Sequence, residues 1–522
     1  GQNFSAFSLT ATGASAAGAI TWSVANSRPD AVDVSIDAST GELSIAPLAD
    51  QFGNADIEVF ANVPGGHASS TRFSLVVSMP QNPVFACGTG VESETGDTLP
   101  GSYTLFEFGQ SRPLAISPNG RYLFVANTPA NCLEIYNVET DVPELISSVA
   151  VGIEPVAVAA RTDTEIWVVN GLSDSVSIVD IRDRPHVKQT LLVGDEPRDI
   201  VFDGSGRAYI TAAFRGQNHP LFDIDDLLTQ GLGRADVWVF DGANPGAALG
   251  GSPLTILNLF SDAPRALAVS PDGNTVYAAG FMTGNQTTTI DQVSTQQGGG
   301  APPPATNVDG VNAPDTGLIV KFDGNNWVDE LNRNWNSQVN FSLPDLDVFE
   351  IDASLPVPAV VNSISGVGTT LFNMTTSPDG KLFVSNTDAR NHVRFEGPGD
   401  VATTVRGNIA KNRVTIIDGG SVVPFELNQH IHFDLPFGQQ VSGPDKLRAI
   451  AQPGAMEYIN GELWVLPFGS SKIQVYADPA VSGSGGWFDN PWSSWIGLLL
   501  PDGGPAGIAV QDYRGRAYVY TR

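Results

Sequence analysis

The segment RPLAISPNGRYLFVAN, which spans residues 112–127, decides the fold because the chain repeats it. Two close copies are RALAVSPDGNTVYAAG at residues 265–280 and MTTSPDGKLFVSN at residues 374–386. Each copy places a Pro-Asn-Gly or Pro-Asp-Gly turn beside runs rich in apolar and β-branched residues, the pattern of two strands joined by a tight turn. The repeated unit is therefore a β-hairpin, and a recurring unit of this kind indicates a repeat architecture.

Four weaker copies bring the number of units to seven, and their spacing sets the kind of repeat. Pro113, Pro155 and Pro197 follow one another at intervals of 42 residues, which is the period of a four-stranded propeller blade. Further strands follow the hairpin within a unit, as in residues 175–180 and 189–193. The sequence therefore predicts a seven-bladed β-propeller over residues 102–522. The weaker copies lie at residues 155–170, 197–212, 447–466 and 505–520.

The first 80 residues have a different organisation. Short runs that alternate apolar and polar residues are separated by Gly, Asp and Ser, as in a small β-sandwich. We therefore expect an all-β chain, with a sandwich at residues 1–80 and a linker at residues 81–101 before the propeller. The runs are residues 20–24, 34–37, 42–45, 57–61 and 73–77.

Two family resemblances agree with this division. FVAN at residues 124–127, WVVN at 167–170 and FVSN at 383–386 resemble the repeat of the bacterial seven-bladed propellers named for Tyr-Val-Thr-Asn. IDASTGEL at residues 36–43, followed by DQFG at 50–53, resembles the cadherin-like and immunoglobulin-like domains of secreted bacterial proteins. These resemblances imply the fold, and they imply little about function because propellers support many activities.

A narrower resemblance points to a class of secreted protein. NTDARNHVRFEG at residues 386–397 and NRVTII at residues 412–417 are similar to segments of large bacterial proteins that carry a c-type cytochrome region, like di-haem peroxidases, after a propeller. The chain contains no Cys-x-x-Cys-His, so it has no attachment site for haem c. The resemblance implies that any haem belongs to a region beyond Arg522, and we expect the chain to be a piece of a longer protein.

Composition excludes several kinds of partner. The chain of 522 residues has 27 Lys and Arg against 56 Asp and Glu, a formal net charge of −29. Nucleic acid and anionic membrane surfaces require clustered basic residues, so neither is an expected partner. No apolar run is long enough to span a bilayer. The acidic charge and the abundance of Gly, Ser and Thr favour an extracytoplasmic location, in the periplasm, at the cell surface or secreted.

Three insertions interrupt the repeat, at about residues 282–316, 324–365 and 483–500. The last contains Trp487, Trp492 and Trp495. These rings could form an aromatic platform for a sugar or a protein partner, or they could pack the loop against its own blade.

Four arginines recur at the start of inner strands, where a propeller places residues near one mouth of its central channel. Their guanidinium groups could converge on an anion. Alternatively, each could pair with a local acid such as Glu196, Asp199 or Asp262 and join one blade to another. The four are Arg112, Arg198, Arg265 and Arg448.

Metal-binding patterns are weak. His430 and His432 form a His-x-His pair that would share one face of a strand, as metal ligands require, although an ordinary strand pair has the same pattern. Two acidic stretches could supply oxygen ligands for a structural Ca²⁺ or could be solvated surface. They comprise Asp223, Asp225 and Asp226 in one stretch, and Asp345, Asp347 and Asp352 in the other.

The two cysteines, Cys87 and Cys132, are expected to form a disulfide in an oxidising compartment. The alternative is a pair of buried thiols.

Catalytic motifs are missing from the sequence, which contains no Gly-x-Ser-x-Gly, no P-loop and no His-Glu-x-x-His. We therefore expect an extracytoplasmic scaffold for protein binding or assembly, the non-haem part of a longer cytochrome-linked protein, without a cofactor of its own. One alternative is a lactonase-like hydrolase with a divalent cation in its channel. Another is a surface-layer or adhesion subunit.

Overall fold

The structure is a computed structural model. It describes residues 7–8, 20–29, 32–47, 53–62, 69–77, 109–220, 223, 225, 229, 231–303, 305–307, 309–340, 342, 344–393, 405, 407–433, 435, 443–478, 498–500 and 503–522. Several residues that the sequence analysis singled out lie outside these ranges, namely Cys87, Asp226, Trp487, Trp492 and Trp495.

The N-terminal part is a small β-sandwich of two three-stranded sheets, with strand orders β1-β4-β3 and β2-β5-β6. Alternation along the strands puts one side chain in two between the sheets, where Val32, Leu43, Ile57 and Val59 form the core. The strands are β1 Phe7–Ser8, β2 Thr21–Asn26, β3 Val32–Ile36, β4 Glu42–Pro47, β5 Gly53–Asn62 and β6 Ser69–Val77.

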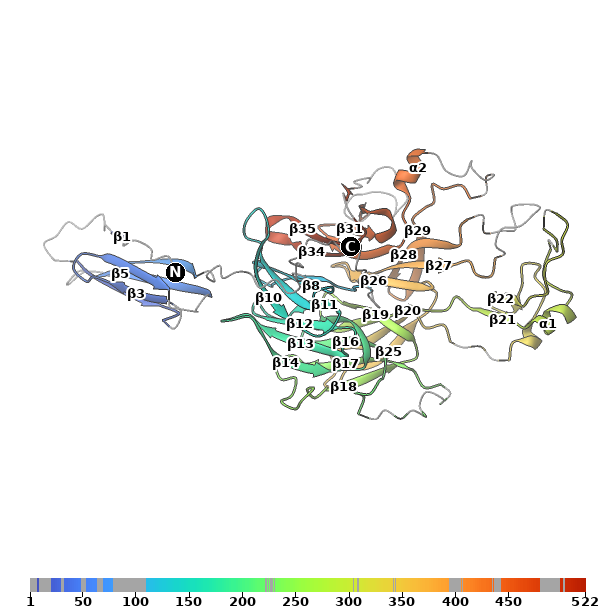
Figure 1. The fold of residues 1–522 in the computed structure, drawn as a ribbon, viewed down its shortest axis with the longest axis horizontal. Helices are drawn as coiled ribbons and strands as arrows, with labels where there is room; N and C mark the ends of the chain where they lie inside the picture. The colour runs from blue at the N-terminus through green and yellow to red at the C-terminus, as the bar shows by residue number, and fades with distance from the viewer. Residues whose placement is uncertain are drawn as a thin grey trace, which may run out of the picture.

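The rest of the chain forms a ring of antiparallel sheets, each built in chain order from the inside outwards (Figure 1). The first three blades have four strands each. They are β7 Leu114–Ile116, β8 Tyr122–Asn127, β9 Cys132–Asn137 and β10 Glu144–Ala150 in blade 1; β11 Pro155–Ala160, β12 Glu165–Asn170, β13 Ser175–Asp180 and β14 His186–Leu192 in blade 2; and β15 Asp195–Phe202, β16 Arg207–Phe214, β17 Ala235–Asp241 and β18 Thr255–Leu259 in blade 3.

Blades 4 to 6 also have four strands each, and two described strands belong to blade 7. They are β19 Asp262–Val269, β20 Thr275–Met282, β24 Val348–Asp352 and β25 Ala359–Ile364; β26 Thr370–Thr376, β27 Leu382–Ala389, β28 Ala410–Asp418 and β29 Ser421–Glu426; β30 Pro453–Ile459, β31 Glu462–Pro467, β32 Lys472–Ala477 and β33 Leu498–Leu499; and β34 Pro505–Gln511 and β35 Arg516–Thr521. Short helices α2 Gly443–Arg448, η4 Phe468–Ser470 and η5 Asp512–Arg514 lie between strands.

The ring is closed by contact between the first and last blades. The seven innermost strands touch in the order β7, β11, β15, β19, β26, β30 and β34, and β34 contacts β7. The all-β fold, a small sandwich followed by a seven-bladed propeller, is therefore as the sequence predicts. No helix within the described ranges is long and apolar enough to cross a membrane.

The Ser-Pro-Asp-Gly signature has a direct structural cause. In blade 4, the Ser270 hydroxyl donates to Asp272 at 2.6 Å and accepts the Thr275 amide at 2.9 Å. Gly273 then adopts a φ of 73°, which a residue without Cβ takes without strain. Blades 1 and 5 repeat this geometry, so the motif fixes the hairpin between the first and second strands.

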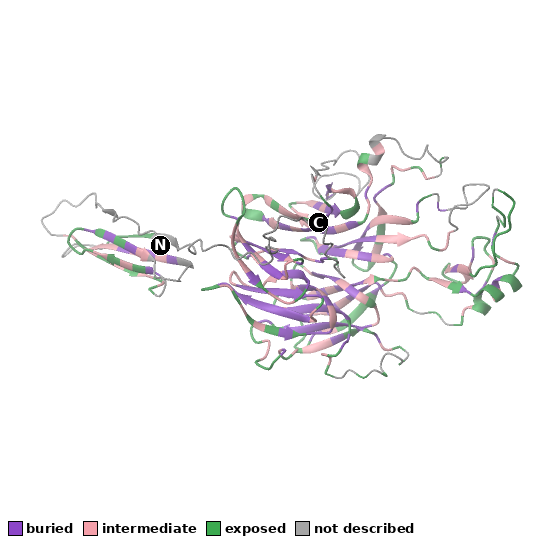
Figure 2. Ribbon diagram, viewed as in Figure 1, coloured by how far each residue is buried: buried purple, intermediate pink, exposed green. Residues whose placement is uncertain are grey.

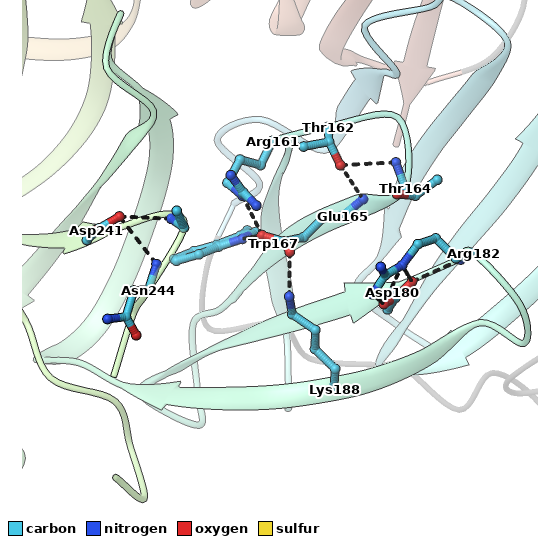
Figure 3. A network of polar contacts seen from close by, with 11 residues as sticks. Arg161, Thr162, Thr164, Glu165, Trp167, Asp180, Arg182, Lys188, Asp241 and Asn244 are labelled. Atoms are coloured by element: carbon cyan, nitrogen blue, oxygen red, sulfur yellow. Dashed lines mark hydrogen bonds and ion pairs between the residues drawn. The ribbon is translucent and has the colours of Figure 1, made fainter. Parts of the chain in front are cut away.

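Buried residues are concentrated in the strands of the blades (Figure 2), and their side chains form clusters that join neighbouring blades. Trp167 of blade 2 and Trp238 of blade 3 belong to one buried cluster. Figure 3 shows how polar groups enclose the first of these rings: the Glu165 carboxylate accepts from Trp167 Nε1 at 3.0 Å, from Arg161 Nε at 2.5 Å and from Lys188 Nζ. The network therefore satisfies the buried indole N–H and shields the inter-blade core.

Residues 283–347 leave blade 4 between β20 and β24 and form a separate small unit, called here the arm (Figure 1). It contains the sheet β21-β22-β23, the helix α1 and the 3₁₀ helix η2. Residues 348–364 do not belong to it, because β24 pairs with β20 and β25 pairs with β24 within the blade. The arm's elements are β21 Thr287–Ile290, α1 Gln292–Gln297, β22 Leu318–Phe322, β23 Trp327–Val328 and η2 Asn336–Gln338.

Candidate functional site in the central channel

A cavity of about 520 Å³ runs along the axis of the propeller, lined by the inner strand of every blade. Most of the residues that line it are Ala, Val, Leu and Ile, although polar atoms make up the larger part of the exposed lining. Arg112, Glu457 and Asp512 are the charged residues in this lining. The chemistry available to a molecule in the channel therefore depends on these three groups.

Arg112 joins three blades at one part of the channel. It lies just before β7 of blade 1, and its Nε and Nη2 donate to the two carboxylate oxygens of Asp199 in blade 3, at 2.9 and 3.0 Å. Nη2 also donates to the Leu267 carbonyl of blade 4 at 2.8 Å. Asp199 is fully buried, so this bidentate pair is the neutralising partner of a buried carboxylate.

Arg265 reaches in the opposite direction, from blade 4 to the segment that precedes blade 1. Its Nη2 donates to the Gln110 carbonyl at 2.6 Å, and its guanidinium lies 5.0 Å from the centre of the Phe281 ring. Burial and the nearby Arg198 guanidinium lower the pKa of Arg265 to about 10. Gln110 in turn donates to Thr128 of blade 1 and Tyr520 of blade 7, so this segment links blades across the ring.

The four arginines of the sequence analysis thus have different surroundings. Arg198 is paired with Glu196 at 2.6 Å, close to its own strand. Arg448 ends helix α2 instead of opening an inner strand, because β30 begins only at Pro453. Arg112 and Arg265 both reach across blades, through hydrogen bonds to protein groups.

Glu457 is the channel residue that sequence reasoning missed. It lies on β30 opposite Trp464, and its carboxyl has no hydrogen bond to any residue that the structure describes. Burial in the channel raises the pKa of Glu457 to about 7, a net value that includes a lowering by Arg112 and a smaller increase by Asp512. A carboxyl of this kind can bind a cation, accept a proton or donate one near neutral pH.

A signal for Glu457 exists in the repeat itself. The register pairs one inner-strand residue of every blade with an aromatic residue on the next strand, and in the other six blades this inner residue is small. A glutamate at this position departs from the pattern. The six equivalents are Ala115, Ala159, Val201, Ala268, Thr375 and Ala509.

The metal-binding candidates are not assembled in the described parts of the chain. His430 and His432 lie in the turns after β29 and not on a strand, and His430 Nε2 contacts the Asp445 carbonyl at 3.2 Å. Asp223 and Asp225 are exposed, and the Asp225 amide donates to Asp223. Among the described residues, no group of three or more His, Cys, Asp or Glu is arranged to hold a metal ion.

Cys132 begins β9 and is fully buried, where its sulfur accepts a hydrogen bond from the Ser148 hydroxyl at 3.3 Å. Because Cys87 lies outside the described residues, the disulfide between them stays a prediction.

Comparison with known proteins finds no matching family model and no matching curated protein. Among solved structures, hydrazine synthase of Kuenenia stuttgartiensis is 18% identical over 81% of this chain and 99% of its own, with a TM-score of 0.49. A putative 6-phosphogluconolactonase of Bacteroides uniformis is 13% identical over 85% of this chain and 93% of its own, with a TM-score of 0.42. A periplasmic gluconolactonase of Pseudomonas aeruginosa is 12% identical over 90% and 96%, with a TM-score of 0.41. Likenesses at this level carry no information about activity.

Proposed function

We propose that this chain is an extracytoplasmic scaffold for protein binding and assembly, and that the arm is its docking element. The observation that supports this proposal is the arm itself, a unit with its own core that extends away from the propeller (Figure 1). Long excursions from a rigid repeat scaffold commonly carry binding functions.

The arm is internally ordered and does not depend on the propeller for its core. Trp335 is buried with Ile290 and Val320, and its Nε1 donates to Asp329 at 3.1 Å. Arg333 stacks on the same ring at 5.3 Å and donates to Asp329 at 2.6 Å. A docking element of this kind presents a preformed surface, which lowers the entropic cost of binding.

The base of the arm is fixed to the neighbouring blade. Asn285 Nδ2 donates to the Ala389 carbonyl at 2.9 Å and to Asn391 at 3.0 Å, and Asn391 donates back to Thr287 at 2.9 Å. These bonds link the arm, which leaves blade 4, to blade 5. The orientation of the arm is therefore tied to the propeller.

The surface of the arm carries exposed apolar side chains. Val293 of α1 is 64% exposed, and Val311 and Leu331 are also exposed. An acidic protein that keeps apolar groups on a projecting unit presents them where another protein could cover them. The partner implied by the sequence resemblance is a c-type cytochrome region of the same gene product.

The test uses the full-length gene product purified from its source. A reduced-minus-oxidised visible spectrum with c-type haem bands, on a product whose intact mass exceeds that of this chain, would support the cytochrome link. A second version, in which residues 286–342 are replaced by a short Gly-Ser turn, should keep the propeller folded but lose the association between the two regions in cross-linking. A colourless product, or unchanged cross-links without the arm, would contradict the proposal.

One observation favours a second candidate, a lactonase-like hydrolase acting in the channel. The Glu457 carboxyl faces a cavity of about 520 Å³ and titrates near pH 7, as a catalytic acid, base or cation ligand would. Lactone hydrolysis that depends on added divalent cation in the parent protein and disappears in Glu457→Gln would favour this candidate over the scaffold.

A further inference from the structure

The arm is joined to blade 4 through two aspartates whose carboxyl groups face each other. Asp345 and Asp347 lie at the end of the arm, directly before β24, and their side chains come within hydrogen-bonding reach. The side chain of Asp347 is fully buried. The Oδ1 atoms of both residues are buried, and neither has a hydrogen-bond donor among the described residues.

The remaining contacts of Asp347 hold the junction together. Its Oδ2 accepts the Val367 amide at 2.6 Å, and its main-chain carbonyl accepts the Gly280 amide at 2.9 Å. Thr283, the first residue of the arm, donates to the Gly368 carbonyl at 2.5 Å. Asp347 and Thr283 therefore connect the two ends of the arm to the 365–369 turn that leads into blade 5.

The Gly284 amide donates to Asp345, and the Val367 and Gly368 amides donate to Asp347, but two buried carboxyl groups within hydrogen-bonding reach of each other still favour a positive charge between them, either a proton or a metal ion. The surrounding charges decide between the two. Asp388 on β27 is paired with Arg413 of β28 at 3.0 Å, and Lys321 of β22 lies near Asp345. Arg413 offsets the charge of Asp388, and Lys321 offsets one of the two charges of the aspartate pair. One negative charge is left, which a single proton neutralises and a divalent cation would exceed.

Space at the pair is also restricted. A Cβ added to Gly284 would lie 2.9 Å from Asp345 Oδ1, so glycine is needed for the close approach of the main chain. Ser365 donates to the main-chain carbonyl of Asp345 and closes the other side. His392 also lies in the vicinity, near Lys321, Asp388 and Arg390, and Arg390 donates to the main-chain carbonyls of Val405 and Asn408. Glu426 lies near Arg413 on the neighbouring strand.

We propose that Asp345 and Asp347 form a proton-sharing latch that holds the base of the arm closed when protonated and releases it as the shared proton is lost. Burial, followed by the charge of Asp345, raises the pKa of Asp347 to about 7, which places this transition in a physiological range. A carboxyl with a raised pKa stabilises the closed state most fully at acidic pH. That stabilisation decreases as the pH rises and is gone above the raised pKa.

The latch does not depend on what the arm binds, so it can be tested independently of the proposed function. Hydrogen exchange of the whole chain, followed by mass spectrometry, gives protection factors once each rate is divided by the intrinsic rate at the same pH. The reporters are peptides that cover residues 345–348 and 365–369. Peptides from β16 in blade 3 report global unfolding, which also changes with pH through Glu457, so opening at the reporters is measured relative to these peptides.

We expect the opening constant at the reporters to rise about tenfold per pH unit from pH 5 to pH 7 and then to level off. In Asp347→Asn the amide replaces the protonated carboxyl as a donor, so protection should become independent of pH. Asp345→Asn should behave in the same way and serves as the second variant if the first fails to fold. Asp352→Asn, at the far end of β24, should keep the pH dependence of the original chain.

Three results would overturn the latch. The first is protection that does not change between pH 5 and pH 8 in the original chain. The second is a pH dependence that survives in both asparagine variants and disappears in His392→Gln, which would assign it to the histidine. The third is full restoration of protection at pH 8 by millimolar Ca²⁺, which would make the pair a cation site.

Discussion

Replacing Glu457 by glutamine should stabilise the propeller, and the gain should depend on pH. In the folded protein, burial raises the pKa of Glu457 from 4.5 to about 7. The folded state therefore binds a proton more tightly than the unfolded chain does. The stabilisation from this proton is fully present below the unfolded pKa and is lost as the pH rises through 7. Glutamine is neutral at every pH and avoids this loss.

The size of the effect follows from the shift. A change of one pKa unit corresponds to about 1.4 kcal/mol, so a shift from 4.5 to about 7 makes the glutamine variant more stable by about 3 kcal/mol at pH 8.5. At pH 5, the folded Glu457 carboxyl is protonated and is therefore as neutral as the glutamine amide, so the difference should be below about 1 kcal/mol. This is a ceiling for a group that faces a channel open to water, because solvent screens part of the cost.

Equilibrium unfolding in urea at pH 5, 7 and 8.5 measures this difference. Glu462→Gln is a suitable control, since Glu462 lies on the adjacent strand β31 and its carboxylate accepts a hydrogen bond from Trp464. The control removes the same charge outside the channel. A stability difference for Glu457→Gln that is the same at all three pH values, or that favours the original protein at pH 8.5, would refute the assignment of Glu457 as a carboxyl whose pKa is raised by its position in the channel.

Other variants test the remaining parts of the fold. Arg112→Met should lower the free energy of unfolding by about 3–5 kcal/mol because it leaves the buried Asp199 unpaired, and adding Asp199→Asn should recover much of the loss in the same urea assay. Gly120→Ala should lower the melting temperature more than Gly380→Ala does. Both residues have a positive φ, but the new methyl group would lie 2.4 Å from the Tyr513 ring at position 120 and would meet no atom within 4 Å at position 380. The difference between the two melting temperatures therefore measures the steric effect alone. Neither of the two cysteines should be alkylated in the unfolded, unreduced chain if they form the predicted disulfide, and labelling of both would exclude it.

Much of the propeller could be predicted because its determinants are local. The Ser-Pro-Asp-Gly turn makes its bonds within six residues, so each copy marks a hairpin by itself, as between Ser270 and Thr275. A period of 42 residues then gives the number of strands in a blade. Seven such blades are enough to predict a closed ring, and in the structure the contact between β34 and β7 closes it.

Features that depend on interruptions of the repeat were harder to predict. The sequence indicates two insertions before blade 5, whereas the structure has one arm, and residues 348–364 return to blade 4 as its outer strands. Because β20 and β24 are far apart in the sequence, no local pattern could predict that they pair. Arg448 was aligned with inner-strand arginines for a related reason, since helix α2 precedes β30 and shifts the repeat.

The residues with candidate chemical roles are those that break a structural rule of the repeat. Six blades place a small residue opposite the aromatic of the second strand, and Glu457 puts a carboxyl there, at the cost of burying it in the channel. Asp347 is fully buried, at the point where the arm rejoins blade 4. Neither residue is needed to form a blade, because the other blades form without an equivalent. Both carboxyls have raised pKa values, which reduce stability as the pH rises, so the pH-dependent measurements on the two sites test whether each has a role beyond the fold.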